Sequence, residues 1–521
     1  MFPILSILIF LPLIGALVLI FARRDDLPFN RNVTLGFMFV ILAMAMGLFI
    51  AFPSVSSVSG GASGMKFEEN SPWVHIQQLG LQINYHLGAD GISLLMILLT
   101  ALISPIAFYA SWNSIAERFR LFSIMFLLVE TGVLGMFVAQ DLILFYVFWE
   151  AMLIPMYFLI GMWGTANKGS FAAIKFFLYT MAGSVLMLVS IIATYMLSTG
   201  TNLNELSNRT FDLAGMLQNL QTHPIAGNIQ LWLFLGFAIA FAIKIPIFPF
   251  HSWLPEAYVE APLGATIMMA AVFSKAGAYG LLRFGLPLFP VVAQELAPWF
   301  LTLGFIGVFY GALIAAVQQD MKRLIAFSSI SHLGVIVLGI FSMSLGNKEL
   351  VAASTNSLTG ASLHLLNHGV IIAALFLIVA FLEQRFGTRT LKDYLGLMRA
   401  MPVFAGFFLV IMLAAIALPG TNGFVGEFLI LLGIFQTYPV FAVLGTSVAV
   451  LTAIYMLWMY QKTMHESPVK PHADAAHHDL KRHEMALLAP AIVLIFWIGF
   501  YPNPFLDRLK DAVAWVLGGI K

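Results

Sequence analysis

Apolar runs of about 20 residues dominate this chain, and each is long enough to cross the hydrocarbon core of a bilayer as a helix. They recur from one end of the 521-residue sequence to the other. Hydrophobic residues make up 60% of the chain and charged residues only 10%, whereas soluble globular proteins carry roughly 25% charged residues. Such a chain cannot be soluble, so we predict an all-α polytopic membrane protein embedded in a lipid bilayer.

Fourteen of these runs are predicted to span the membrane. They begin near Pro3, Val33, Gly91, Phe119, Leu142, Phe171, Ile229, Leu263, Ala297, Leu324, Thr355, Pro402, Val440 and Met485. The seventh span is interrupted by Pro246 and Pro249, and the twelfth by Pro419, Gly420 and Gly423. Because proline cannot donate a backbone hydrogen bond and glycine favours turns, we expect both helices to be broken.

The two broken spans lie an odd number of spans apart, so they should cross the membrane in opposite directions. Paired broken helices in two halves are typical of inverted repeats with a functional site near the midplane. We predict two inverted five-helix repeats, spans 4–8 and spans 9–13. The predicted segments are 1–118 for helices 1–3 and an outer loop, 119–286 and 287–461 for the repeats, and 462–521 for a histidine-rich cytoplasmic loop, helix 14 and a short tail.

Basic residues in the loops predict the orientation, because Lys and Arg accumulate on the cytoplasmic side. With the N-terminus outside, sixteen of the 26 Lys and Arg residues fall on inner loops and seven, Arg283 among them, on outer segments. Both termini are therefore predicted to be periplasmic, in the inner membrane of a bacterium. The two long outer segments, Pro53–Asp90 and Ser198–Asn228, are predicted to be covering loops.

Composition also excludes several classes of function. The chain has no cysteine, so it cannot hold a thiolate-bound iron–sulfur cluster or a cysteine zinc site. Its net charge of +1 does not favour nucleic-acid binding. It also lacks a phosphate-binding glycine loop that ends in Lys-Ser/Thr. We therefore expect no cofactor and no metal in this chain, and any redox chemistry must lie in other subunits.

Ionisable residues inside the spans are the strongest functional signal, because such groups are rare in membranes and usually line a pathway or a cavity. They are spread over eight spans, with one or two in each, whereas a single ligand site would concentrate them. We interpret this distribution as a proton relay. The residues are Glu130, Glu150, Lys175, Lys244, Lys275, His332, His364, His368 and Glu427.

Lys244 has the clearest signal of these residues. It lies in the apolar run 231–255, directly before the prolines of the seventh span, and a cation at that depth needs water or a partner. Glu150 in the fifth span could neutralise a neighbouring lysine. Glu130 and Lys175 are secondary candidates that could pair with each other or with the main pair, and His251 is a further secondary candidate.

Structural roles remain open for the other buried groups. Lys275 lies among small residues that allow close helix packing, Glu427 could stabilise the resumed half-helix through its dipole, and His332 could be a satisfied core histidine. His364 and His368 share a helix face, but no third ligand is evident in the sequence, so no metal is expected there. The histidine-rich stretch 465–483 is interpreted as a solvated loop.

Five ordered motifs resemble the antiporter-like membrane subunits of respiratory complex I, across nearly the whole chain. They are ILFYVFWEAML, KIPIFPFHSWLPEAYVEAP, FSKAGAYGLLRF, QDMKRLIAFSSISHLG and PGTNGFVGEF. The second broken helix typically carries lysine in the L and N branches of that family and in multisubunit sodium/proton antiporters. This chain has Glu427 there and lacks the long lateral helix of the L branch, so it is most similar to the subunit M, or chain 4, branch.

The resemblance implies a proton-translocating, non-redox subunit of an NADH:quinone oxidoreductase, flanked by subunits L and N. It implies that NADH, FMN, iron–sulfur clusters and quinone are bound by other subunits. A multisubunit sodium/proton antiporter, a membrane-bound hydrogenase and an inert scaffold are the alternatives. The implied roles are Glu150 as the partner of Lys244, Lys275 and His332 as the central relay, His368 as the second relay histidine, and Glu427 as the terminal group toward a neighbouring subunit.

Overall fold

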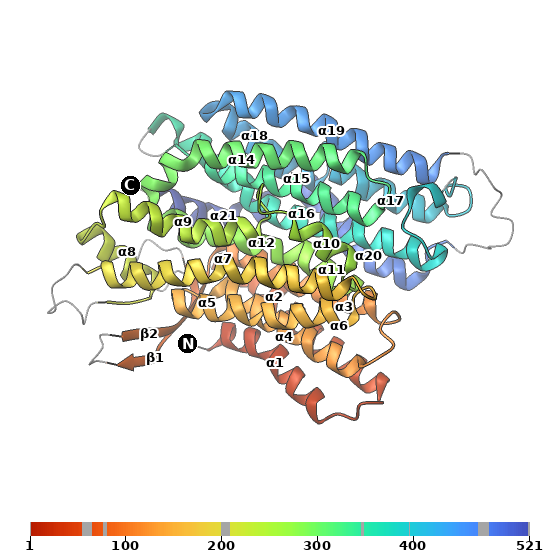
Figure 1. Cartoon of the computed structure of the whole chain (residues 1–521), viewed down its shortest axis with the longest axis horizontal. Helices are drawn as coiled ribbons and strands as arrows, with labels where there is room; N and C mark the ends of the chain where they lie inside the picture. Colours follow the sequence, from red (N-terminus) through yellow and green to blue (C-terminus); the bar gives the residue numbers. More distant parts are fainter. Residues whose placement is uncertain are drawn as a thin grey trace.

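The chain folds into a bundle of membrane-length helices with both termini toward the same end (Figure 1). The computed structural model describes residues 2–54, 65–76, 81–199, 209–344, 348–394, 396–466 and 479–518. Within these ranges thirteen helical segments are long and apolar enough to cross a membrane, and two shorter apolar helices supply the interrupted twelfth span. The predicted all-α polytopic fold is confirmed, and its spans match the fourteen expected.

Most spans are single helices that begin close to the predicted residues. The first eight spans and their connections contain α1 (Ile4–Phe21), α2 (Leu27–Ala51), α3 (Gly91–Ser111), α4 (Phe119–Val138), α5 (Leu142–Ala151), α6 (Leu153–Trp163), α7 (Gly169–Leu197), α8 (Leu213–Thr222), α9 (Gly227–Lys244), α10 (Trp253–Glu260), α11 (Leu263–Met268), α12 (Ser274–Gly280) and α13 (Leu286–Leu288). The remaining helices are α14 (Pro290–Ala316), α15 (Met321–Phe341), α16 (Val351–Phe386), α17 (Pro402–Ala415), α18 (Asn422–Thr437), α19 (Pro439–Met464), α20 (Arg482–Phe500) and α21 (Asn503–Gly518). The largest shift is in the ninth span, which begins at Pro290 rather than at Ala297.

Aspartate caps start five of the helices. The side chains of Asp26, Asp90, Asp141, Asp212 and Asp320 each accept a hydrogen bond from a backbone N–H in the first turn of the helix that follows. The first N–H groups of a helix have no partner inside it, and an acidic cap satisfies one of them while complementing the helix dipole. These caps fix where α2, α3, α5, α8 and α15 begin.

The first long outer segment contains a β-hairpin, where the sequence predicts only a covering loop. Strand β1 (Lys66–Ile76) pairs antiparallel with β2 (Leu81–Ala89). Polar and apolar residues alternate in LQINYHL, as in a half-buried strand, and that alternation was the available signal. The end of β2 is buried against the bundle, where Gln140 donates to the Gly88 carbonyl at 3.2 Å. The second outer segment likewise contains a helix, α8.

The eighth span holds a charge that the sequence argument put outside. Arg283 is only 2% exposed and lies in the span 263–288. Its guanidinium donates to the carboxylate of Asp90, the residue that caps α3. A buried cation is tolerated at membrane depth when it is paired in this way, so the assignment of Arg283 to an outer loop was wrong.

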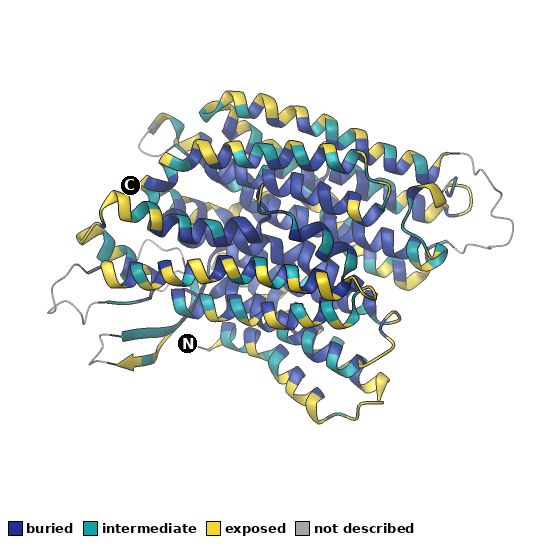
Figure 2. Cartoon of the chain, viewed as in Figure 1, coloured by how far each residue is buried: buried dark blue, intermediate teal, exposed yellow. Residues whose placement is uncertain are grey.

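The core is formed by three spans whose apolar, membrane-length stretches are fully buried: 263–288, α15 and α16. Figure 2 shows them in dark blue inside a shell of helices with exposed outer faces. Close packing of α16 on α18 depends on glycine: a Cβ on Gly433 would lie 2.4 Å from the Ala353 carbonyl oxygen, and one on Gly360 would lie 2.6 Å from the Ile430 nitrogen. These contacts place the second broken span against the most buried helix.

The C-terminal region closes the bundle. The tail helix α21 packs on α16 and α3, with Phe505, Leu509 and Val513 buried. Of the histidine-rich stretch before α20, His472, His477 and His478 lie outside the described residues.

Candidate functional site

The seventh span is broken directly after Lys244. Helix α9 ends at that residue, and Pro246 and Pro249 lie in the non-helical stretch before α10. The negative end of a helix dipole favours a cation in the last turn, so the position suits a lysine. The break therefore places a cation at the end of a half-helix inside the bundle.

Aromatic rings surround the Lys244 ammonium. Its nitrogen lies 5.0 Å from the ring centre of Trp149, 5.1 Å from that of Phe273 and 5.8 Å from that of Phe176. The residue is 1% exposed, and its Nζ has no hydrogen-bond partner among the described residues. Cation–π attraction is stronger in such a desolvated site than at a surface, so these rings supply part of what water would otherwise give.

Glu150 lies near Lys244 without bonding to it. It is close to the end of α5, just before the break that separates α5 from α6. Its charge acts on Lys244, but among the described residues no ion pair joins them, and Glu150 Oε1 is buried with no hydrogen-bond partner. The expected Glu150–Lys244 pair is thus a long-range interaction in this conformation.

Lys275 is held by an irregular helix. It lies in α12 between two π-helical segments, Met269–Phe273 and Leu281–Gly285. Such π-bulges disturb the regular pairing of backbone groups, and here the Ala270 carbonyl accepts a hydrogen bond from Lys275 Nζ at 2.5 Å. The same nitrogen contacts Ser274 Oγ at 3.1 Å and His368 Nδ1 at 2.8 Å. The fully buried ammonium therefore uses all three of its donors.

Three histidines and a glutamate continue from Lys275. His332 comes from α15, His364 and His368 come from α16, and Glu427 comes from α18. His332 Nδ1 lies 2.9 Å from Glu427 Oε1, and His364 Nε2 lies 3.6 Å from the same oxygen. The three imidazole ring centres are 5.6 to 6.2 Å apart. A cavity of about 10 Å³ lies between them, close to the minimum that holds one water molecule.

The spatial order of the histidines differs from the order expected. The sequence argument placed His332 between Lys275 and His368, but His368 is the residue that contacts Lys275. His332 follows it, with ring centres 5.6 Å apart, and bonds to Glu427. The buried line is thus Lys275, His368, His332 and Glu427, with His364 beside its end.

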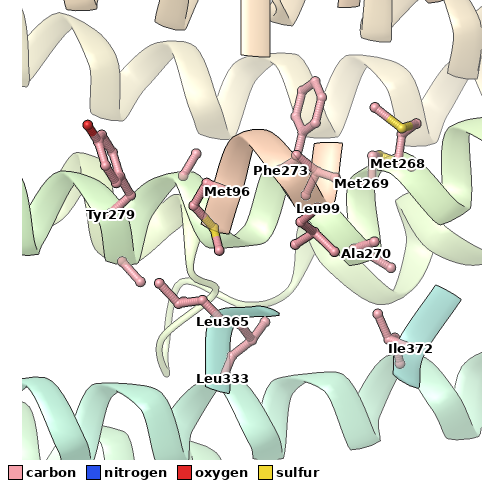
Figure 3. Close-up of a cluster of buried hydrophobic side chains, with 14 of the residues drawn as sticks. Met96, Leu99, Met268, Met269, Ala270, Phe273, Tyr279, Leu333, Leu365 and Ile372 are labelled. Carbon is pink, nitrogen blue, oxygen red and sulfur yellow. The ribbon is translucent and has the colours of Figure 1, made fainter. Parts of the chain in front are cut away.

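Apolar side chains enclose this line. Figure 3 shows residues from α3, the eighth span, α15 and α16 that meet in one buried cluster. Leu365 and Ile372 lie three and four residues from His368 and so share its helix face, and Leu333 follows His332. Because this cluster is buried and mostly apolar, electrostatic interactions along the line are screened much less than in water.

The break in the twelfth span positions Glu427. Gly420 has φ +92°, a conformation that glycine adopts without strain. A Cβ on Gly423 would lie 2.2 Å from the Ala414 carbonyl oxygen, so only glycine fits there. Asn367 of α16 donates to the Asn422 carbonyl at 2.7 Å. The break is thus anchored to the helix that carries the two histidines.

Of the secondary candidates, His364 lies beside the end of the line, whereas Glu130, Lys175 and His251 have other surroundings. Glu130 is fully buried in α4, and neither carboxylate oxygen has a hydrogen-bond partner among the described residues. Lys175 pairs with Glu256 at 2.9 Å, so the suggested Glu130–Lys175 pair is not formed. His251 lies in the first break, with its ring 4.9 Å from that of Tyr310.

Sequence reasoning missed several members of this region. Glu256, the partner of Lys175, lies in the first turn of α10, and its place directly after the broken span was the available signal. The aromatic rings around Lys244 had no distinguishing signal, because 47 phenylalanines and 10 tryptophans are spread along the chain. The Asp90–Arg283 pair joins residues 193 positions apart, which no local pattern reveals.

Comparison with known proteins identifies the family. The family described as "NADH:quinone oxidoreductase/Mrp antiporter, TM" matches residues 139–452. The NADH-quinone oxidoreductase subunit M of Rhodobacter capsulatus is 39% identical over 511 residues, which cover 98% of this chain and 95% of that protein. The NADH-ubiquinone oxidoreductase chain 4 of Marchantia polymorpha is 34% identical over 510 residues, with 98% and 96% covered.

Solved structures agree with these sequence matches. A chain of respiratory complex I from Thermus thermophilus, solved with bound NADH, superposes with a TM-score of 0.83 at 28% identity, covering 99% of each chain. A chain of the membrane-bound sulfane sulfur reductase, an archaeal respiratory membrane complex, has a TM-score of 0.80 at 22% identity, covering 99% of this chain and 98% of that one. The second match shows a shared fold. The chain therefore belongs to the NADH:quinone oxidoreductase/Mrp antiporter family, as an antiporter-like membrane subunit of the complex I subunit M type.

Proposed function

We propose that this chain translocates protons within an NADH:quinone oxidoreductase, through a relay of buried Glu, Lys and His side chains. The observation that carries the proposal is the contact line from Lys275 through His368 and His332 to Glu427. Each of these groups can bind or release a proton, and neighbouring members are in contact or separated by room for a water. A line that crosses four helices in an apolar interior suits proton transfer along the membrane plane.

Lys244 would act as the switch that feeds this line. Its charged form is stabilised by the nearby charge of Glu150 and by three aromatic rings. If Glu150 moved away, the buried ammonium would lose its counter-charge and desolvation would disfavour it further. Lys275 would first pass its own proton to His368, which it contacts at 2.8 Å, and its neutral amine would then accept the proton from Lys244. Lys275 lies two residues beyond Phe273 of the aromatic cage. The broken helix offers backbone groups and space for water on that path.

The remaining parts of the proposal concern the surroundings of the chain. We place it in a bacterial inner membrane with both termini periplasmic, between subunits L and N. NADH, FMN, iron–sulfur clusters and quinone would bind in other subunits, which supply the driving force. Two inverted five-helix repeats are supported by matching contacts: α9 packs between α7 and α12, and α18 packs between α16 and α19.

The test is charge removal in the assembled complex, reconstituted in vesicles. Lys275→Met and Lys244→Met keep most of the side-chain volume and remove the proton-binding group. We expect coupled NADH oxidation and proton uptake to fall together by about tenfold or more, as is usual when a proton-transfer group is lost. The matched control is Lys462→Met, because Lys462 is partly exposed, near the end of its helix, and forms an ion pair with Glu466 one helical turn away.

Normal coupling in both variants would contradict the relay and support a structural scaffold. An experiment with the same vesicles distinguishes proton pumping driven by electron transfer from sodium/proton antiport. The family description also names an antiporter. An antiporter would exchange protons for sodium when a sodium gradient is imposed without NADH. We expect no such exchange beyond that of empty vesicles, and a full exchange signal would favour the antiporter.

A further inference from the structure

Three side chains with metal-ligand chemistry converge at the end of the buried line. His332, His364 and Glu427 each place one ligand atom within 4.8 Å of the other two. They come from α15, α16 and α18. The sequence offered only His364 and His368, one helical turn apart, and showed no third ligand. The third ligand is supplied by the broken twelfth span, which brings Glu427 to the two imidazoles.

The separations suit a small tetrahedral ion. With metal–ligand bonds of about 2.0 to 2.2 Å, two ligand atoms on a tetrahedral zinc ion stand roughly 3.3 Å apart. The His332 Nδ1 to Glu427 Oε1 separation is 2.9 Å, and the His364 Nε2 to Glu427 Oε1 separation is 3.6 Å. These two edges bracket the ideal value, and the third, between the two histidines, lies within 4.8 Å, so the imidazoles would have to rotate toward each other to close the set around an ion.

The imidazoles have free nitrogen atoms and a space between them. Neither ring nitrogen of His364, which is 1% exposed, has a hydrogen-bond partner among the described residues. The adjacent cavity of about 10 Å³ is lined by both histidines, Glu427 and Ser328. His368 is not available as a ligand through Nδ1, because that atom is bound to Lys275. The arrangement is thus three protein ligands and one open position, as in many zinc sites that retain a water.

We propose that His332, His364 and Glu427 form a reversible binding site for a divalent transition-metal ion of the Zn²⁺ type. Two imidazoles and one carboxylate suit zinc or cobalt, whereas Mg²⁺ and Ca²⁺ prefer all-oxygen sites. In tight zinc sites the second ring nitrogen of each histidine donates to a fixed partner. His332 Nε2 and His364 Nδ1 have no such partner in the described part of the chain, so the ion is held weakly enough for a chelator to remove it.

Metal binding would compete with protons at this position. The ion would bind the His332 nitrogen and the Glu427 oxygen that now share a hydrogen bond. The proton between them would be released. A second cavity, of about 20 Å³, reaches the same pair between α18 and α19, where Ser331 and Thr452 line it. The Glu427 side chain is 14% exposed, so the pair is not completely sealed within the chain. If the proposed relay operates, a bound ion interrupts it.

Cobalt absorption tests the site directly and without transport. The full chain is purified with a histidine-free tag into lipid nanodiscs, with the loop histidines 465, 472, 477, 478 and 483 replaced by asparagine. We expect Co²⁺ to give the intense visible bands of a tetrahedral site at one ion per chain, and Zn²⁺ to displace it. His364→Asn should weaken binding at least tenfold, because a ligand is lost. His251→Asn, a buried histidine outside the cluster, should leave the bands unchanged.

A cysteine variant keeps the test decisive if His364→Asn disturbs folding. The chain has no native cysteine, so His364→Cys places a single thiolate in the site and should add a sulfur-to-cobalt charge-transfer band. Missing tetrahedral bands, or bands unaffected by both His364 variants, would overturn the metal site. If the cobalt bands are present but Zn²⁺ does not inhibit proton transport, the metal site is supported and only the proposed relay is contradicted.

Discussion

Lys275 illustrates how a single buried charge is stabilised in this interior. Its ammonium is fully buried, yet each of its donors has an acceptor: the Ala270 carbonyl, the Ser274 hydroxyl and the His368 imidazole. Lys244, by contrast, has aromatic rings and the charge of Glu150 but no hydrogen bond among the described residues. Without a hydrogen-bond partner, Lys244 depends on that counter-charge, which supports Lys244 as the switch of the proposed relay.

Gly433 offers a test of packing at the same scale. A methyl group there would lie 2.4 Å from the Ala353 carbonyl oxygen and 2.7 Å from the Ser357 nitrogen, which are backbone atoms of α16. Helices α16 and α18 would have to separate, and such overpacking costs about 1–3 kcal/mol. We expect Gly433→Ala to lower the temperature at which the detergent-solubilised chain loses its monodisperse gel-filtration peak.

The matched control for this substitution is Gly406→Ala in the other half of the same broken span. A Cβ at Gly406 meets nothing within 4 Å, and alanine is the better helix former. Equal thermal behaviour of the two variants would show that the close approach of α16 and α18 carries little stability.

At the scale of elements, α3 and the eighth span are joined by one buried ion pair. Asp90 accepts a hydrogen bond from Ser93 N at 2.8 Å as the cap of α3, and its other oxygen binds Arg283. Trp515 of α21 lies over the same guanidinium at 5.0 Å. Three elements distant in sequence therefore meet at this pair, and Arg283 itself lies in the π-helical segment Leu281–Gly285.

Asp90→Asn tests the buried ion pair separately from the helix cap. Asparagine caps helices as well as aspartate does, so α3 should still begin at Gly91, but Arg283 would lose its counter-charge. Removing one partner of a buried ion pair costs about 3–5 kcal/mol, so we expect a large loss of thermal stability in detergent. Asp507→Asn removes an exposed partner of Lys510 and should cost less than about 1 kcal/mol. Similar losses in the two variants would count against a structural role for the buried pair.

At the scale of the whole molecule, the β-hairpin and α8 are connected by a polar cluster outside the spans. His86 of β2 hydrogen-bonds to Asp212, and its other nitrogen lies 3.4 Å from Glu68. Burial by itself lowers the pKa of His86, but the bond and charge of Asp212 and the charge of Glu68 raise it above its ordinary value of 6.5. Burial raises the pKa of the neighbouring Asp141 to about 6.

These two shifts predict that the hairpin loosens as pH rises. Both groups bind their proton more tightly in the folded chain, so their stabilisation is full below the unfolded pKa values and is lost as pH passes the folded ones. For Asp141 the stabilisation is lost between about pH 4 and about pH 6. For His86 the loss begins near pH 6.5 and is complete only at a higher pH. We expect hydrogen exchange of β2, corrected for intrinsic rates, to quicken between pH 6 and pH 8.

The control for this pH dependence is His86→Gln, which cannot titrate. It should flatten the change above pH 6.5, while peptides from α16 exchange equally slowly at both pH values. A pH response that persists unchanged in His86→Gln would assign it to other groups.

Much of the fold could be predicted because a membrane imposes strict rules on a sequence. Every backbone group at membrane depth must be paired internally, so the apolar runs become helices, and proline and glycine break them. The prediction of the fold failed at two places where the general rule used for the sequence did not hold. Arg283 was placed outside because charges usually avoid the bilayer, and the β-hairpin was missed because its composition suggests a loop. The two π-helical segments around α12 leave no mark in the sequence MAAVFSKAGAYGLLRFG, residues 269–285.

The sequence alone determined which residues are chemically able to form a site, because an ionisable residue within an apolar run is costly and stands out. It could not determine which of them meet. His368 rather than His332 contacts Lys275, Glu256 rather than Glu130 pairs with Lys175, and Glu427 reaches two histidines. Only the tertiary structure decided these partners, because helix packing joins residues up to 95 positions apart within the line, and local spacing carries no information at that range.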